Sequence, residues 1–279
     1  MKTQFLPGPN GYPIPLIHTL TGREQRICLI AHGFGSSKNS PTAQMMLHGL
    51  PQVGIGAIAF DAVAHGESPV DGSFLRLDNC LRDMAALEDW IAAQAPQAKI
   101  CYFSSSFGAY QNLLYLSRYP HRGDRSFLRS AAINMSKIFS HRTPQQQSDL
   151  DTRGFTILNQ GYDRPIKVTR EFVADLAAHN LFALYRPGTT RVQMIHGGAD
   201  TTAAPEDARR FAQAFSLPLL EVPRGEHSLD GPGQAHLPRL NHRGGPTVVA
   251  RRTCFGRPQL CRQCGPDRAW SLTVGQPVQ

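Results

Sequence analysis

Short apolar runs recur along this chain, and segments with helical spacing separate them. Uninterrupted apolar runs of this length are typical of strands buried on both faces, as in parallel sheets. Strands that alternate with helices predict βαβ units and a mostly parallel central sheet flanked by helices. After a hairpin at residues 3–22, the predicted strands are 27–31, 55–60, 99–103, 130–135, 191–196 and 217–222, and the predicted helices are 41–52, 78–95, 108–119, 168–183 and 205–216.

Two stretches depart from this alternation. Residues 140–190 begin with a polar segment and contain one predicted helix. An insertion between two core strands, above the strand ends, is where a small lid would lie. Residues 235–279 are rich in Arg, Gly and Pro and show little periodicity. We therefore expect one domain at 1–234 with a lid at about 140–190, followed by an atypical, poorly ordered tail at 235–279.

The net charge of +8 is concentrated in that tail. Residues 235–279 hold seven arginines, no lysine and a single acidic residue, whereas the rest of the chain carries 22 basic and 20 acidic groups. An almost neutral body gives no electrostatic reason to expect a nucleic-acid partner. No apolar run reaches the ~18 residues that a membrane span needs, and the N-terminal residues lack the apolar segment of a secretion signal. We expect a cytoplasmic protein without nucleic-acid or membrane partners, and its oligomeric state stays open.

The six cysteines predict neither disulfides nor a metal centre. Thiols of a cytoplasmic protein are mostly reduced. Cys254, Cys261 and Cys264 include only one closely spaced pair, whereas a structural zinc site usually has two such pairs. We therefore expect no metal and no other cofactor.

The most specific motif is Ser104-Ser105-Ser106-Phe107-Gly108, which follows one predicted strand and precedes a predicted helix. This is the context of a nucleophile elbow, in which the middle residue exposes its hydroxyl on a strained strand-to-helix turn. The positions two before and two after must be small, and glycine is usual at both, so Ser104 is a departure. The N-terminus of the following helix favours developing negative charge. The alternative is that Ser106 is an ordinary turn residue.

Four motifs in order resemble the α/β-hydrolase superfamily, and within it the small esterases of the cinnamoyl/feruloyl-esterase and acylglycerol-lipase type. The resemblance spans roughly residues 20–233 and rests on His32–Gly35, Asp61–Ser68, Ser104–Gly108, and His196–Asp200 with Gly225–His227. It implies the α/β-hydrolase fold. It also implies an oxyanion hole made by the backbone N–H of Phe107 and a second N–H at Phe34.

The order Ser, Asp, His along the chain is the one expected for this fold. A serine hydroxyl needs an imidazole to accept its proton, and the imidazole needs a carboxylate to fix its tautomer. We predict Ser106 as nucleophile, His227 as base and Asp200 as the orienting acid. The alternatives are a helix-capping Asp200, with Asp207 or Asp230 in its role, and an ordinary loop histidine at 227. We interpret the other strand-end histidines as structural, namely His32, His65 and His196.

Serine at the elbow argues against dehalogenases and epoxide hydrolases, which attack through a carboxylate, and against enzymes of the dienelactone-hydrolase type, which use cysteine. We therefore predict a carboxylesterase-like serine hydrolase that cleaves a small-molecule carboxylic ester through an acyl-enzyme. A serine aminopeptidase, a thioesterase or a non-catalytic protein of the same fold stay as alternatives, because fold does not settle substrate. Aromatic residues of the insertion are expected mainly to form lid core rather than an acyl pocket: Phe155, Tyr162, Phe172, Phe182 and Tyr185.

Overall fold

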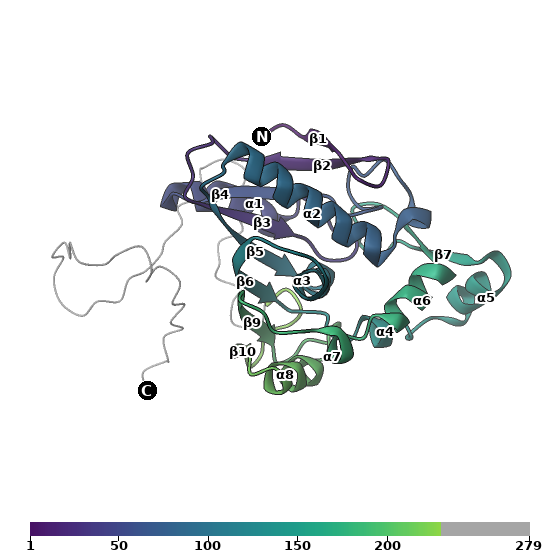
Figure 1. The fold of residues 1–279 in the computed structure, drawn as a ribbon. Coiled ribbons are helices and arrows are strands. Elements are labelled where there is room, and N and C mark those ends of the chain that lie inside the picture. The colour runs from purple at the N-terminus through teal and green to yellow at the C-terminus, as the bar shows by residue number, and fades with distance from the viewer. Residues whose placement is uncertain (230–279) are drawn as a thin grey trace, which may run out of the picture. The chain divides into compact units, whose positions relative to one another are not determined.

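The computed structural model describes residues 1–229, and eight of their strands form one sheet (Figure 1). The strand order is β1-β2-β4-β3-β5-β6-β9-β10. The hairpin β1-β2 is antiparallel and β2 runs antiparallel to β4, whereas the other neighbours are parallel. The strands are β1 (Gln4–Pro7), β2 (Pro13–His18), β3 (Arg26–Ala31), β4 (Gly56–Phe60), β5 (Lys99–Ser105), β6 (Gly123–Arg129), β9 (Arg191–Gly197) and β10 (Leu219–Val222). The predicted, mostly parallel central sheet is confirmed.

Helices pack on both faces of this sheet. They are α1 (Pro41–Gly49), α2 (Leu77–Gln94), α3 (Phe107–Arg118) and α8 (Pro205–Ala214), with short 3₁₀ turns η1 (Leu50–Val53) and η2 (Gly72–Phe74). Successive strand side chains point to opposite faces. Cys28 and Ile30 of β3 therefore share a small apolar cluster with α1, while Ile27 and Leu29 join the larger core with α2, α3 and α8. Within residues 1–229 we find no helix long and apolar enough to cross a bilayer.

The predicted strand at 130–135 is wrong. The strand next to β5 is β6, which ends at Arg129, and residues 130–134 form a loop beyond it. Ser130 takes a φ of 48°, in the left-handed region that interrupts a strand. Ala131 and Ile133 are nevertheless buried, since they lie at the carboxyl edge of the sheet under other segments. Their apolar character reflects that position and not strand pairing.

A 61-residue segment, 130–190, joins β6 to β9, which are neighbours in the sheet. Figure 1 shows most of it beyond the carboxyl ends of the parallel strands. It contains α4 (Met135–Ile138), α5 (Pro144–Arg153), β7 (Phe155–Leu158), β8 (Ile166–Thr169), α6 (Arg170–Ala178) and α7 (Leu181–Leu184). We call this segment the insertion.

The single helix predicted at 168–183 is also wrong, because the structure divides that stretch into the end of β8 and two helices. Thr169 begins α6 by accepting a hydrogen bond from Phe172 N–H, and Asn180 begins α7 in the same way with Phe182 N–H. Side-chain oxygens that accept such bonds are strong helix starts. The predicted tail, its cysteines and Asp230 lie outside the described residues.

Candidate active site

Ser106 lies between the end of β5 and the start of α3, with φ 52° and ψ −113°. A left-handed φ costs an L-residue roughly 1–2 kcal/mol, so the surrounding packing must impose it. Gly108 meets one such constraint, because a Cβ there would lie 2.6 Å from the carbonyl oxygens of Ala31 and His32. Ser104 occupies the other small position and is buried, so the departure from glycine fits the turn.

Three side chains from distant parts of the chain form a line of hydrogen bonds at this turn. His227 Nε2 lies 2.9 Å from Ser106 Oγ, and His227 Nδ1 lies 2.7 Å from Asp200 Oδ2. A carboxylate can only accept, so Nδ1 carries the proton and donates to Asp200. Nε2 then has a free lone pair to accept the Ser106 hydroxyl hydrogen. The structure thus brings together the three residues that the sequence predicts for this site.

Asp200 accepts hydrogen bonds on both of its oxygens. Oδ1 accepts from the N–H groups of Thr202 and Ala203, at 2.9 and 2.8 Å. Oδ2 accepts from His227, and His196 Nε2 lies 3.2 Å from the same oxygen. Burial by itself raises the pKa of Asp200, but the hydrogen bonds from His196, His227 and the Ala203 N–H outweigh it and hold this pKa well below its ordinary value. The carboxylate therefore stays ionised beside His227.

The loop that carries His227 follows β10 and rests on the loop after β9. Ala199 N–H donates to Gly225 O at 2.9 Å, and Gly225 N–H donates to Val222 O. A side chain at Gly197 would place its Cβ 2.2 Å from Gly225 O, so only glycine permits this approach. His227 and Asp200 are thus held on two loops in direct backbone contact.

Phe107 and Phe34, whose backbone N–H groups are expected to form the oxyanion hole, both belong to segments that adjoin Ser106. Phe107 is the first residue of α3, and no side chain caps this helix start. The first N–H groups of a helix have no partner within it. Phe34 follows Gly33, whose Cβ position would lie 3.2 Å from Ser106 Cβ. The Phe34 ring meets the rings of Phe107 and His65 edge to face, with centroids 5.5 and 5.0 Å apart.

The loop between β3 and α1, residues 32–40, carries Phe34, and we call it the Phe34 loop. Sequence reasoning missed the ion pairs that hold this loop in place. Lys38 Nζ lies 2.8 Å from Asp61 Oδ2 and 2.7 Å from Glu67 Oε1. The Lys38 and Asp61 side chains are both fully buried, and Lys38 N–H donates to the same carboxylate. The buried pair ties the loop after β3 to the loop after β4. A lysine in a turn gives little sign in the sequence that it is buried.

His32 makes a second connection between the same two loops. Its Nδ1 donates to Gly33 O at 2.8 Å, and its Nε2 accepts from Ala62 N–H at 3.1 Å. Burial keeps the pKa of His32 below its ordinary value, so the ring stays neutral and keeps both bonds.

The insertion contacts the Phe34 loop directly. Asp163 N–H donates to Gly35 O at 2.9 Å, and the Tyr162 ring occupies the space that a Gly35 side chain would need. Arg164 donates to the carbonyl oxygens of Gly66 and Ser68. The five aromatic residues predicted for the insertion divide by burial: Phe172 and Tyr185 are buried in the core, whereas Tyr162, Phe155 and Phe182 are partly buried.

The alternative acid Asp207 lies elsewhere, on α8, where Lys137 and Arg210 face it at 3.6 and 3.9 Å. Among residues 1–229, no group of three or more His, Cys, Asp and Glu side chains is arranged to hold a metal ion. The arrangement around Ser106 joins a hydroxyl, an imidazole and a carboxylate in one line of hydrogen bonds.

Comparison with known proteins gives a family match over part of the chain. The sequence model of the family described as "Serine aminopeptidase, S33" matches residues 22–158. The comparison with curated protein sequences finds no match.

Solved structures match over most of the chain. Alpha/beta hydrolase domain-containing protein 10 from mouse is 16% identical, with a TM-score of 0.67 over 82% of this chain and 91% of its own. Est1E from Butyrivibrio proteoclasticus, solved with ferulic acid bound, is 16% identical, with a TM-score of 0.66 over 81% of this chain and 92% of its own. The esterase domain of a Rhodothermus marinus protein is 20% identical, with a TM-score of 0.60 over 82% of this chain and 90% of its own. At these identities the likeness concerns the fold.

Proposed function

This chain has the α/β-hydrolase fold, and from that premise we propose that it is a serine hydrolase that cleaves a carboxylic ester. The observation that supports this most is the hydrogen-bond line from buried Asp200 through His227 to Ser106 at a strained turn. The esterases among the structurally similar proteins agree with an ester substrate.

In the acylation step, Ser106 Oγ attacks the ester carbonyl carbon while its proton passes to His227 Nε2. Asp200 stabilises the imidazolium that forms. The carbonyl oxygen becomes an alkoxide and accepts hydrogen bonds from the N–H groups of Phe34 and Phe107. Each such donor raises kcat by a factor of about 10²–10³ in enzymes of this kind. Collapse of the intermediate breaks the ester bond, and the leaving alkoxide takes the proton from His227.

Deacylation repeats the sequence with water. His227 Nε2 accepts a proton from a water molecule as its oxygen attacks the acyl carbon. The second tetrahedral intermediate collapses, Ser106 recovers its proton, and the free acid leaves. No redox partner or cofactor enters this cycle.

The alternative of a non-catalytic protein requires that His227 be poorly supported. The backbone contacts of Gly225 with Gly197 and Ala199 argue against it, since they hold the His227 loop through described residues alone. The 2.9 Å contact between His227 Nε2 and Ser106 Oγ is already at hydrogen-bond distance.

The test is hydrolysis of 4-nitrophenyl esters from acetate to laurate by the wild type and by Ser106→Ala. We expect kcat of the variant to fall by a factor of about 10³–10⁶, while its circular dichroism spectrum stays unchanged. Ser148→Ala, at an exposed position on α5, is the matched control and should keep wild-type activity. A fluorophosphonate should label the wild type and not Ser106→Ala. Near wild-type activity in Ser106→Ala would show that the nucleophile is misassigned.

One observation favours a second candidate, a serine aminopeptidase, because the family model that matches residues 22–158 carries that description. The same three residues could attack an amide, with His227 protonating the departing amine. Aminoacyl 4-nitroanilides measured beside the corresponding esters separate the two functions. A higher kcat/KM on anilides with a free amino group than on any simple ester would favour the peptidase.

A further inference from the structure

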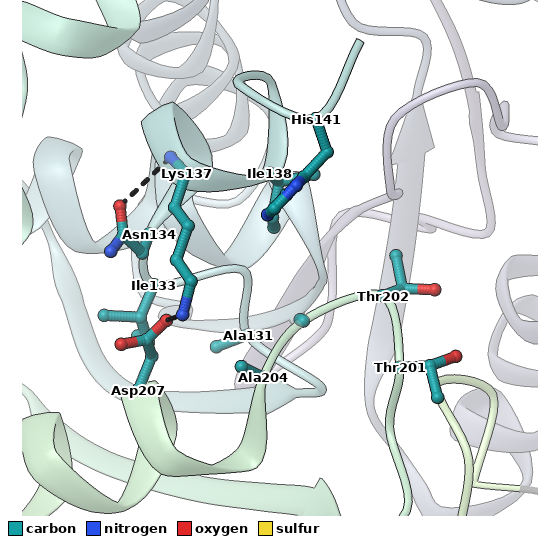
Figure 2. A pocket seen from close by; sticks show the side chains of 11 residues that line it. Ala131, Ile133, Asn134, Lys137, Ile138, His141, Thr201, Thr202, Ala204 and Asp207 are labelled. Atoms are coloured by element: carbon teal, nitrogen blue, oxygen red, sulfur yellow. Dashed lines mark hydrogen bonds and ion pairs between the residues drawn. The ribbon is translucent and has the colours of Figure 1, made fainter. Parts of the chain in front are cut away.

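A pocket of about 330 Å³ opens beside the candidate site (Figure 2). One wall comes from the loop after β6 and from α4, and includes Asn134, Lys137 and His141. The other wall comes from the loop after β9 and the start of α8, and includes Thr202 and Asp207. Alanine and isoleucine side chains also line it, so the pocket combines apolar walls with a few polar groups.

The pocket walls are continuous with the candidate catalytic residues. Ala131 and Ile133 line the pocket, and Ala132 between them donates its N–H to Ser106 O at 3.2 Å. On the opposite wall, Thr202 and Ala203 donate their N–H groups to Asp200. The two segments that line the pocket therefore also hydrogen-bond to Ser106 and Asp200.

Lys137 and Asp207 line the pocket as a cation and an anion of unequal exposure, with side chains that are 54% and 9% exposed. Lys137 Nζ lies 3.6 Å from Asp207 Oδ2, and Arg210 lies 3.9 Å from Oδ1 of the same carboxylate. The Asp207 carboxylate thus has two cationic partners, of which only Lys137 lines the pocket. Both distances exceed that of a direct N–H···O hydrogen bond, so the Lys137 ammonium keeps donors for a further acceptor.

Lys137 is held in the pocket wall by the start of α4. Its backbone N–H donates to Asn134 Oδ1 at 3.2 Å, which starts α4, and Figure 2 shows its side chain extending along the pocket toward Asp207. Its side chain is 54% exposed, which leaves the ammonium accessible to a ligand.

We propose that this pocket binds a part of the ester substrate that ends in a carboxylate, and that Lys137 contacts that carboxylate. The proposal rests on the ester-hydrolase function proposed above and narrows its substrate class to half-esters of dicarboxylic acids or esters of hydroxy acids. The apolar lining residues hold the carbon chain, and the exposed Lys137 ammonium, beside a mostly buried Asp207 carboxylate, selects its charged end. A substrate that ends in an ammonium group would instead have to bind Asp207. Such a substrate is disfavoured because Asp207 already has two cationic partners.

The test compares esters of equal length that differ only in their terminal group. The acyl series is 4-nitrophenyl hexanoate, mono-4-nitrophenyl adipate and 4-nitrophenyl 6-aminohexanoate. The alcohol series is the butyrate esters of 1-pentanol, 5-hydroxypentanoate and 5-amino-1-pentanol. In one series we expect kcat/KM for the carboxylate ester to exceed that for the neutral ester by roughly three- to tenfold, as for a partly exposed ion pair.

Lys137→Met should abolish this preference and leave the neutral ester within about twofold of the wild type. Lys99→Met makes the same change at an exposed position where β5 begins, at the opposite edge of the sheet, and should keep the preference. The proposal is overturned if neither series prefers the carboxylate, if the ammonium ester is preferred, or if the preference survives in Lys137→Met.

A binding measurement separates this proposal from the proposed function. Ser106→Ala protein should bind the same esters without hydrolysing them, and calorimetric Kd values should show the same order. If the wild type hydrolyses no ester and binding still prefers the carboxylate in a Lys137-dependent way, the hydrolase function fails and the anion pocket stands. If binding shows no such preference, the pocket assignment fails.

Discussion

Asp200 accepts from two histidines, of which only His227 is expected to exchange protons during turnover. His196 Nε2 lies within 3.2 Å of Asp200 Oδ2 and within 2.9 Å of Ala203 O, two acceptors, so it carries a proton. Its side chain is 1% exposed. In the proposed mechanism His196 is therefore a positioning residue, because it holds the Asp200 carboxylate that would orient His227.

We expect His196→Leu to lower kcat/KM about tenfold, the effect of losing one hydrogen bond to a charged group. The acid limb of the pH profile should also move to higher pH, since a carboxylate with fewer donors stabilises the adjacent imidazolium more strongly. His196→Gln can place an N–H near the Nε2 position and should restore most of the activity. Equal losses at every pH in both variants would indicate a purely structural role.

The elbow turn makes a prediction about stability at a single position. Gly108→Ala would force a Cβ to within 2.6 Å of two backbone oxygens, so we expect unfolding in urea to show a loss of about 1–3 kcal/mol. Gly188→Ala is the matched control, because no atom lies within 4 Å of its Cβ position. The control should be neutral or slightly stabilising. Equal stabilities for the two variants would show that the turn relaxes freely.

At the scale of elements, the N-terminal hairpin meets α2 through a buried carboxyl group. Asp83 of α2 is 2% exposed and accepts a hydrogen bond from Asn10 Nδ2 at 2.8 Å. Burial raises the pKa of Asp83 to about 7, although the bond from Asn10 acts in the opposite direction. The folded pKa lies above the ordinary value, so this group makes stability fall as pH rises from about 4 to about 7.

We therefore expect Asp83→Asn to be more stable than the wild type at pH 8, by on the order of 2–4 kcal/mol. At pH 4 the carboxyl is protonated in the folded chain, so the two proteins should differ little. Urea unfolding at pH 4, 6 and 8 measures this. A variant that is no more stable at pH 8 than at pH 4, relative to the wild type, would mean that the Asp83 carboxylate is better solvated than its burial indicates.

The elements show where sequence patterns are sufficient and where they fail. Strands β3, β4 and β5 were predictable because they are buried on both faces and read as continuous apolar runs. β6 reads GDRSFLR, with charges at both ends, while the apolar residues just beyond it line the pocket. Residues buried beyond a strand's end and residues paired within a strand show the same apolar pattern, so the run at 130–135 resembles a strand in the sequence alone.

The candidate site divides in the same way. Ser106, Asp200 and His227 were predictable because each follows a strand end in the order that the fold requires. His196 and Lys38 act through contacts between segments far apart in sequence, and a single sequence does not give those contacts. The insertion was the least predictable part. Its short helices begin at the capping residues Thr169 and Asn180, and these helices are too short to show a clear apolar periodicity in the sequence.

For the whole molecule, two buried groups give opposite responses to pH. Burial, and then the neighbouring His32, lower the pKa of His65 to about 3. Because this folded value lies below the ordinary one of 6.5, His65 makes stability fall as pH drops from about 6.5 toward 3. Asp83 changes stability in the other direction over much of the same range.

The two slopes oppose each other between about pH 4 and 6.5. We expect the wild-type unfolding free energy to change less over this interval than that of Asp83→Asn, in which the His65 contribution is unopposed. Thermal unfolding at half-unit pH steps, with both proteins in the same buffers, checks the difference in slope. Parallel curves would show that Asp83 does not titrate as its burial dictates.

The contact between the insertion and the Phe34 loop has a consequence for how proteins of this kind diversify. Tyr162, Asp163 and Arg164 bond to or pack on Gly35, Gly66 and Ser68, so the insertion helps to shape the loop that would hold the oxyanion. A lineage that altered the insertion to accept a new substrate would alter that loop in the same step. Substrate selectivity and turnover rate would then change together. Exchange of the insertion between related proteins would transfer both properties only if the contacts of Tyr162, Asp163 and Arg164 were kept.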